Sequence, residues 1–183
     1  NNTSRYFEYY FKKYPNIIRK SRTSVAVVND KASKTDWIEL GKDIFSYYGL
    51  GCRNVTKVFF PIGFDVPRFI DELQSFAGKM DNVKFINNLE YHKSIMLINS
   101  VPFLDGGCVL LKEDETIHSP LSVLHYEFYD NLVTVKEAIN SVKEELQCVV
   151  GVEDFCSVGF GKTQSPNLWD YADNIDVVQF LLS

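Results

Sequence analysis

Hydrophobic and polar residues alternate along this chain in two distinct patterns. Apolar residues spaced three and four positions apart predict amphipathic helices at residues 33–48, 65–76 and 134–147, and an aromatic-rich stretch at residues 5–14 is a further candidate helix. Short, mainly apolar runs typical of buried strands occur at residues 24–28, 55–60, 94–98, 108–111, 122–128, 148–152 and 177–182. Since strands and helices alternate, the pattern predicts an α/β layered sandwich with a largely parallel sheet.

The helix predicted at residues 33–48 has a signal at each end. Ser33 and Asp36 resemble a capping box, in which Asp replaces the usual Glu. A glycine-rich turn at residues 49–51 ends the helix. Cys52 therefore lies just after a helix and just before a buried strand.

Cys52 is the main candidate for a catalytic residue. A thiolate nucleophile needs exposure, nearby positive charge and an open backbone around it. Gly49 and Gly51 remove side chains that would block a substrate carbonyl, and Arg53 supplies a cation. Composition alone favours an inert buried thiol at this position. The glycine-flanked junction between helix and strand is what favours a nucleophile, with Gly51 and Arg53 in supporting roles.

The remaining cysteines, Cys108, Cys148 and Cys156, lie within apolar runs, so we interpret them as inert buried thiols. The chain lacks the close Cys and His pairs that zinc sites require, and no metal site is predicted. His92, His118 or His125 could serve Cys52 as a base, although each is more typical of a surface or supporting residue.

Two short patterns suggest functions that their surroundings argue against. Residues 159–163 end like a phosphate-binding loop, but the required glycine is replaced by Cys156 and Pro166 interrupts the helix that should follow. Residues 54–56 match a glycosylation pattern, which an intracellular chain would not use.

Length and composition limit the protein class. The 183 residues and 45% hydrophobic content predict one domain over residues 1–183, with residues 1–22 as a linker or packing helix. The formal net charge of -5 argues against a nucleic-acid-binding protein. No apolar run approaches the roughly 20 residues of a membrane span, so we expect a cytoplasmic protein. Because the chain starts without Met, we also expect it to be a piece of a longer protein.

Four segments together carry a resemblance to a known family, namely residues 11–20, 49–55, 101–105 and 168–173. From Arg22 to Gln74, the order of strand, helix, cysteine turn, strand and helix resembles the opening of an aldehyde dehydrogenase catalytic domain. The four segments more closely resemble the LuxC-type acyl-CoA reductase branch of that superfamily. Leu50 stands where the dehydrogenases usually have Gln, which fits the reductase branch better.

The resemblance implies a reaction and a cofactor. Cys52 would attack a long-chain acyl-CoA or acyl-protein thioester, and its backbone N–H would help to hold the oxyanion. NADPH would then reduce the S-acyl enzyme to release an aldehyde. In the loop related to the one that reaches the nicotinamide ribose in the dehydrogenases, Glu115 is the nearest counterpart of the first Glu.

The superfamily's dinucleotide-binding domain has no counterpart in this sequence, because no glycine-rich strand-turn-helix fingerprint occurs. The general-base Glu and the oxyanion Asn that dehydrogenases take from that domain are therefore missing too. We expect that the isolated chain binds NADPH poorly and turns over slowly. The missing N-terminal nucleotide-binding domain is an expected partner, and a homodimer is an expectation from the family.

Two other functions stay open at this point. A cysteine-dependent acyltransferase or thioesterase would acylate Cys52 without using a reduced nicotinamide. A non-catalytic interaction domain would keep the fold and use its aromatic surface, because residues 6–11 are unusually rich in Tyr and Phe.

Overall fold

The computed structural model describes residues 2–19 and 21–182, and residues 1, 20 and 183 lie outside it. The predicted linker at residues 1–22 therefore falls partly outside the described residues. The elements are α1 (Asn2–Phe11), β1 (Thr23–Val27), α2 (Lys34–Phe45), η1 (Ser46–Gly49), β2 (Val55–Pro61), α3 (Val66–Leu73), η2 (Gln74–Lys79), α4 (Val83–Ile98), β3 (Leu104–Asp105), β4 (Leu110–Glu113), β5 (Val123–Tyr129), α5 (Leu132–Ser141), η3 (Lys143–Glu145), β6 (Leu146–Val150), η4 (Ala172–Asn174) and α6 (Val177–Leu182).

Within the described residues, one six-stranded sheet has the order β3-β4-β5-β2-β1-β6. Every neighbouring pair is parallel except β3 and β4, which are antiparallel. The prediction of an α/β fold with a largely parallel sheet is confirmed. Near its start, β1 places Ser24 opposite Val55 of β2 on one side and Cys148 of β6 on the other.

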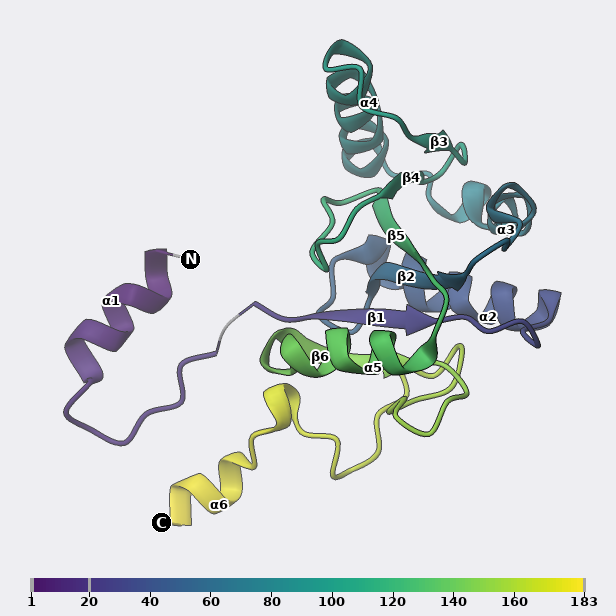
Figure 1. Cartoon of the computed structure of the whole chain (residues 1–183). Helices are drawn as coiled ribbons and strands as arrows, with labels where there is room; N and C mark the ends of the chain where they lie inside the picture. The colour runs from purple at the N-terminus through teal and green to yellow at the C-terminus, as the bar shows by residue number, and fades with distance from the viewer. Residues whose placement is uncertain (1, 20, 183) are drawn as a thin grey trace.

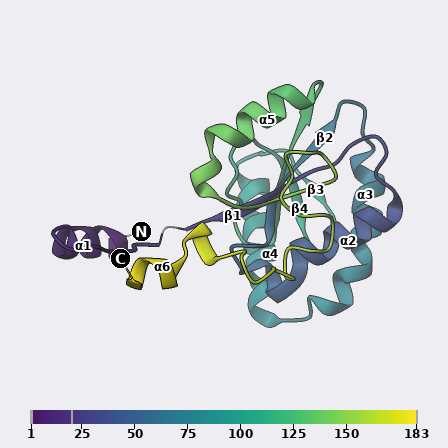
Figure 2. The same cartoon turned by 90° about the horizontal axis from the view of Figure 1, so that it is seen from below.

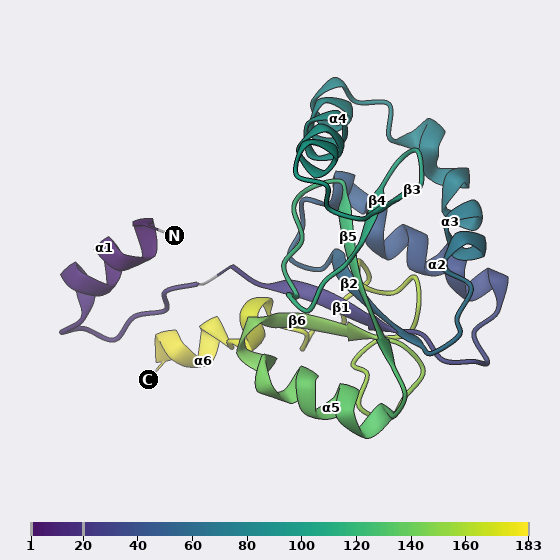
Figure 3. The same cartoon turned by 45° about the horizontal axis from the view of Figure 1, so that its top comes forward.

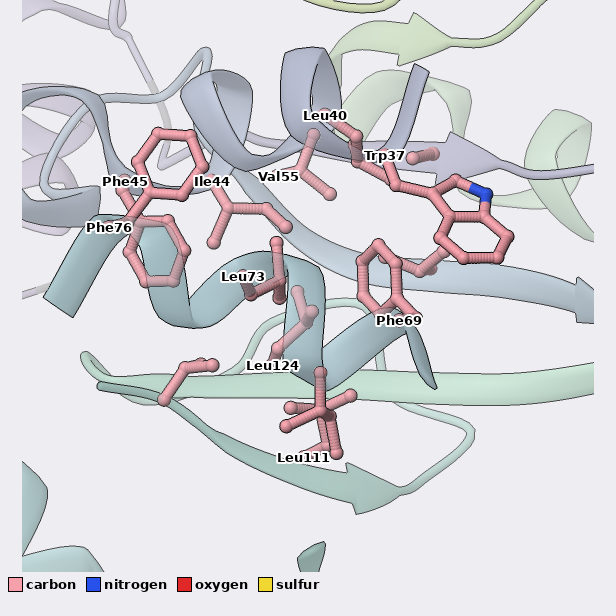
Figure 4. Packing of buried hydrophobic residues seen from close by; sticks show 14 of the residues in the cluster. Trp37, Leu40, Ile44, Phe45, Val55, Phe69, Leu73, Phe76, Leu111 and Leu124 are labelled. Atoms are coloured by element: carbon pink, nitrogen blue, oxygen red, sulfur yellow. The ribbon is translucent and has the colours of Figure 1, made fainter. Parts of the chain in front are cut away.

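Helices cover both faces of the sheet (Figures 1 and 3). Helices α2 and α3 pack on one face, where Phe45 and Phe76 stack with ring centroids 5.2 Å apart (Figure 4). Helix α5 covers the other face and buries Val135 and Ile139 against β1, β2 and β6. Because both faces are covered, the central strands are apolar throughout, which is why they read as continuous hydrophobic runs.

Helices α1 and α6 project from the same side of the molecule, away from its body (Figure 2). Strand β1 points away from that side, so the two helices project from the edge where the parallel strands begin (Figure 1). Two ion pairs join the segments that lead to them, from Arg19 and Arg22 to Asp173. No helix in the described part of the chain is long and apolar enough to cross a membrane.

Two predicted strands are wrong, because residues 94–98 and 177–182 are helical. The first run ends α4, which begins at the Asn82 cap and packs Leu89 and Met96 on β4 and β5. The second run follows Asp176, whose side chain accepts a hydrogen bond from the N–H of Gln179. A short apolar run does not distinguish a strand from a helix, and in both cases an Asn or Asp cap starts a helix instead.

Three predicted boundaries also move. The helix predicted at residues 134–147 ends at Ser141, because Leu146 pairs with Thr23 and starts β6. The strand predicted at residues 108–111 starts at Leu110, and Cys108 lies in the preceding turn. Helix α2 begins as predicted, since Ser33 and Asp36 form a capping box, but it ends at Phe45.

Asp43 of α2 joins the C-terminal segment to this layer of the fold. Its side chain is 1% exposed and accepts hydrogen bonds from the Gly161 N–H at 2.6 Å, the Thr163 N–H at 3.1 Å and the Thr163 hydroxyl at 2.8 Å. Burial raises the pKa of this carboxyl, while the bonds from Thr163 and Gly161 oppose the shift. These two amides point to an internal carboxylate and are therefore not free to bind a phosphate.

We expect Asp43→Ala to lower the free energy of unfolding by roughly 2–4 kcal/mol, because it leaves buried donors of Gly161 and Thr163 without an acceptor. Urea denaturation would measure the loss. Asp71→Ala, at an exposed position of α3, is the control and should change stability by less than about 0.5 kcal/mol. Equal effects of the two substitutions would show that Asp43 does not hold this segment.

Candidate functional site

Cys52 is exposed and lies on a tight turn between η1 and β2. The Asn54 N–H donates to the Gly51 carbonyl at 3.0 Å, so Cys52 and Arg53 are the two central residues of a four-residue turn. This turn stands at the edge of the sheet where β2 begins. The predicted position of Cys52, between a helix and a strand, is confirmed.

The side chain of Asn54 holds this turn in place. It is fully buried, and its Oδ1 accepts from the Gly51 N–H at 2.8 Å. Its Nδ2 donates to the carbonyls of Asp43, Ile44 and Ser46, at 3.1, 3.2 and 2.8 Å. The carbonyls at the end of α2 have no partners within the helix, so one amide both caps the helix and fixes the start of the cysteine turn.

Gly51 is required by this arrangement. A Cβ atom at this position would lie 2.9 Å from Oδ1 of Asn54, closer than real Cβ atoms approach a neighbour. The glycine therefore allows the contact between its own N–H and Asn54. Its predicted role in opening space for a substrate stays a prediction.

The chain upstream of the turn has an unusual backbone. Tyr47, Tyr48 and Gly49 are consecutive residues in the left-handed region, with φ of 53°, 59° and 75°. Such a conformation is unfavourable for residues with a side chain, and the surrounding contacts must hold it. Tyr48 is half-buried, and its ring lies 6.2 Å from that of Phe85 in α4. The strained run turns the chain sharply from α2 toward β2.

Ser24 of β1 forms a hydrogen bond with the backbone of Cys52. Its buried hydroxyl donates to the Cys52 carbonyl at 3.1 Å and accepts from the Cys148 N–H at 3.1 Å. Across residues 2–19 and 21–182, no acceptor takes a hydrogen bond from the N–H of Cys52 itself. The carbonyl of Cys52 is therefore held by Ser24, whereas the N–H of Cys52 is free to bind a ligand.

The guanidinium of Arg53 is turned toward the C-terminal segment. Its Nη1 lies 3.3 Å from Sγ of Cys148 and donates to the Thr163 carbonyl at 3.3 Å, while Nη2 donates to the Asp170 carbonyl at 3.2 Å. These bonds hold residues 163–170 against the turn. The role of Arg53 in activating Cys52 stays a prediction, since its head group is bound to other partners.

The other thiols differ from Cys52 in their surroundings. Cys108 and Cys148 are buried as predicted, whereas Cys156 is half-buried. Burial raises the pKa of Cys108 and of Cys156 to about 11. Burial also raises the pKa of Cys148, and the positive charge of Arg53 opposes this shift. A raised pKa keeps a thiol in its unreactive form, which supports the interpretation of Cys108 and Cys156 as inert.

The histidines lie in three different places. His125 is buried in β5, and its Nδ1 lies 3.0 Å from the Thr116 carbonyl; burial lowers its pKa. His118 lies 3.1 Å from the carboxylate of Glu145, and His92 is on α4. Among the described residues, no hydrogen bond joins any of the three to Cys52. The structure therefore brings no histidine base to the cysteine.

A cavity of about 220 Å³ lies beside the cysteine turn. Gly49 and Leu50 form the side of the cavity nearest the turn, and Leu121 lies across from Gly49. The full lining is Ile44, Phe45, Tyr48, Gly49, Leu50, Val55, Thr56, Phe85, Ser119, Pro120, Leu121, Ser122 and Val123. The walls combine apolar side chains with the polar groups of Thr56, Ser119 and Ser122, and Cys52 itself is not among the lining residues.

Glu115 lies on the loop that leads to this cavity. Its backbone carbonyl accepts from Nζ of the buried Lys57 at 2.7 Å, and its side chain is exposed. Two residues later, the Ile117 carbonyl accepts from the Thr56 hydroxyl at 2.6 Å. The loop therefore runs along the start of β2, and the role of Glu115 in binding a cofactor stays a prediction.

Sequence reasoning missed Asn54, Ser24 and Cys148. Asn54 belongs to a glycosylation pattern and to the segment 49–55, and Ser24 to a predicted strand, but none of these patterns predicts the hydrogen bonds of the two side chains. Their importance comes from hydrogen bonds to residues that lie up to 124 positions away in the chain. The one signal in the sequence is that Asn54 follows Gly51 at the spacing of a four-residue turn.

No family model matches the sequence, and no curated protein matches it. Solved structures do. The chain is similar to a P. syringae indole-3-acetaldehyde dehydrogenase mutant in complex with NAD+ and IAA, with a TM-score of 0.54, 9% identity, and coverage of 76% of this chain and 36% of that chain. It is also similar to an oxidoreductase from Marinobacter aquaeolei (TM-score 0.53, 12% identity, 80% and 39% coverage) and an aldehyde dehydrogenase mutant from Bacillus cereus (0.51, 11%, 76% and 37%).

The fold is aldehyde-dehydrogenase-like. At identities of 9–12%, these similarities show the fold alone. The chain spans 36–39% of the length of these three proteins. This chain therefore has the layered α/β fold that the sequence predicts. The fold corresponds to one portion of each of these three proteins.

We expect Asn54→Ala to lower the free energy of unfolding by roughly 3 kcal/mol, because it leaves the Gly51 N–H and the carbonyls at the end of α2 unpaired. Urea denaturation would measure this. Asn54→Asp keeps the acceptor for Gly51 but loses both donors, so it should also be destabilised. Asn87→Ala, on the exposed side of α4, is the control and should cost less than about 0.5 kcal/mol. A small loss for Asn54→Ala would mean that other contacts hold the turn.

Proposed function

We propose that this chain is the catalytic part of a reductase that converts long-chain acyl-CoA or acyl-protein thioesters to aldehydes with NADPH. The observation that carries the proposal is the exposed Cys52 thiol on a hydrogen-bonded turn beside a cavity that has several apolar side chains. The aldehyde-dehydrogenase-like fold supports an oxidoreductase that acts at the aldehyde level. The finer assignment to acyl thioesters and to the LuxC-type branch comes from the sequence resemblance.

In this proposal, the Cys52 thiolate attacks the thioester carbonyl and expels the carrier thiol. The amide of Gly51 is bound to Asn54, whereas the amide of Cys52 has no protein acceptor in the described residues and would donate to the oxyanion. The bond from Ser24 to the Cys52 carbonyl keeps the turn still during attack. When the carrier thiol departs, the acyl group stays on the sulfur of Cys52. Reduction of this S-acyl group releases the aldehyde.

NADPH supplies the hydride when bound. The exposed carboxylate of Glu115 fits a role in accepting hydrogen bonds from ribose hydroxyls, because its loop runs toward Cys52. The phosphates need donors from elsewhere, since the amides of Gly161 and Thr163 are bound to Asp43. We therefore propose that a nucleotide-binding domain outside these 183 residues holds most of the cofactor, and that the isolated chain binds NADPH poorly.

The cavity beside Gly49 would take the first part of the acyl chain. Its volume of about 220 Å³ is below the range of roughly 300–1,000 Å³ usual for pockets that enclose a drug-sized ligand. A linear chain needs only a narrow site, and the apolar walls would favour methylene groups over water. A longer chain would extend past this cavity.

One observation favours an additional interaction role. The aromatic residues of α1 are highly exposed, with Tyr6 at 67% and Tyr9 at 79%, and Trp169 in the C-terminal segment is 70% exposed. Large exposed apolar surfaces are typical of contacts with another domain or subunit. These segments project at the same edge of the sheet as the cysteine turn (Figure 1). A cofactor-binding domain or a second copy of the chain would fit there.

The decisive experiment mixes the full-length protein with a long-chain acyl-CoA in the absence of nicotinamide and measures the intact mass. We expect an acyl adduct that NADPH discharges as aldehyde. Cys52→Ala should show no adduct, whereas Cys156→Ala, which removes a half-buried thiol elsewhere, should show the same adduct as the unmodified protein.

Other outcomes identify the alternatives. An adduct that is discharged at the same rate without NADPH would identify an acyltransferase or thioesterase. No adduct with any chain length or carrier would remove the catalytic assignment and favour an interaction domain.

We also expect Leu121→Trp to fill the cavity beside Gly49 and to lower kcat/KM for a long-chain acyl-CoA about tenfold relative to a short-chain one, equivalent to losing the burial of about two methylenes. Steady-state kinetics with acyl chains of different length would test this. Ile62→Trp, at a 69% exposed position after β2, is the size-matched control. Equal losses for short and long chains would place the acyl chain elsewhere.

A further inference from the structure

The side chain of Ser24 contacts the backbones of two cysteines, Cys52 and Cys148. The hydroxyl of Ser24 lies 3.1 Å from the carbonyl oxygen of Cys52 and 3.1 Å from the amide nitrogen of Cys148. The two backbone atoms therefore lie within twice that distance of each other. Residues joined by a disulfide have Cα atoms about 4.4–6.8 Å apart, so the bond forms when the cysteine turn brings Cys52 to that distance from Cys148.

Arg53, which belongs to the cysteine turn, also contacts the side chain of Cys148. Its Nη1 lies 3.3 Å from Sγ of Cys148, and its other bonds to the carbonyls of Thr163 and Asp170 keep it there. Burial raises the pKa of Cys148, and the guanidinium beside its sulfur opposes this shift by stabilising the thiolate, which is the form that attacks another sulfur. The charge of Cys52 adds to the effect of burial in raising the pKa of Cys148, as expected for two thiols that lie near each other.

The remaining cysteines lack these features. Cys108 is buried against the carbonyl of Leu73 on the α3 side of the sheet. Cys156 packs with the cluster on the α5 face, near Gly151. Among the described residues, neither is bonded to an arginine or to the cysteine turn. Only Cys148 combines proximity to Cys52 with a cation at its sulfur.

We propose that Cys52 and Cys148 form a disulfide when the protein meets hydrogen peroxide, and that Cys148 thereby protects Cys52 from irreversible oxidation. The formation of the bond does not depend on the proposed function. Its consequence, a reversible block of acylation at Cys52, does rest on that function.

The chemistry balances as a two-electron oxidation. The Cys52 thiolate attacks one oxygen of peroxide, which breaks the O–O bond and gives a sulfenic acid and hydroxide. The Cys148 thiolate then attacks the Cys52 sulfur, which forms the S–S bond and releases a second hydroxide. The two hydroxides take up the two thiol protons, so two thiols and one peroxide become one disulfide and two waters.

The test treats the full-length protein with hydrogen peroxide, blocks free thiols and identifies the products by peptide mass spectrometry without reduction. Trypsin releases Cys52 in residues 43–53, and Cys148 with Cys156 in residues 144–162. A second digestion that cuts after Glu153 separates Cys148 from Cys156. We expect a cross-link from residues 43–53 to residues 146–153, which dithiothreitol removes.

Variants separate this bond from general oxidation. In Cys148→Ser we expect no cross-link and irreversible sulfinic or sulfonic acid at Cys52, with loss of acylation that dithiothreitol does not restore. Cys156→Ser should behave like the unmodified protein. Circular dichroism and thermal unfolding would verify that each variant is folded, and the cross-link in the unmodified protein needs no variant at all.

Three results would overturn the proposal. Cys52 joined to Cys108 or Cys156, Cys52 oxidised to an acid in the unmodified protein as readily as in Cys148→Ser, or no oxidation of Cys52 would each exclude the pair. A cross-link in a protein that never forms an acyl adduct would leave the disulfide intact and remove only the reductase. An adduct without a cross-link would do the reverse.

Discussion

The buried side chain of Asn54 is the contact on which the candidate site depends. One amide group bonds to three carbonyls at the end of α2 and to the N–H of Gly51 at the start of the cysteine turn. Buried polar groups are costly unless their hydrogen bonds are satisfied, so this side chain permits only a narrow set of positions for the turn. The left-handed backbone at Tyr47 and Tyr48 is tolerated because these bonds hold both of its ends.

The site lies at an unusual edge of the sheet for an open α/β fold. Ligands in such folds usually bind outside the carboxyl ends of the strands. Here the carboxyl ends of β1 and β2 lead into helices α2 and α3, which Ser33 and Asp65 cap. Cys52 instead stands where β2 begins, because the chain turns sharply at the end of α2. The projecting helices α1 and α6 lie toward the same edge (Figure 1).

Polar contacts over long sequence distances bring the parts of this edge together. Ser24 joins the turn to β6, Arg53 joins it to the C-terminal segment, and Asp43 joins that segment to α2. These residues come from strands and helices that the apolar pattern predicts, but their partners follow only from the order of the strands. The same order places Cys148 and the start of β2 on either side of Ser24, whose hydroxyl joins the backbones of Cys52 and Cys148 although the two are far apart in the sequence.

The sequence by itself determined the layered α/β fold, the capped start of α2, strands β1, β2 and β5, and the position of Cys52 between a helix and a strand. Hydrophobic spacing, caps and glycine turns act locally, so a reader of the sequence can see them. Only the tertiary structure decided that residues 94–98 and 177–182 are helical, since a short apolar run takes the form that its neighbours allow. It also decided the roles of Asn54, Ser24 and Arg53. A polar side chain has no preferred partner until the fold brings one within hydrogen-bonding distance and excludes water from the pair.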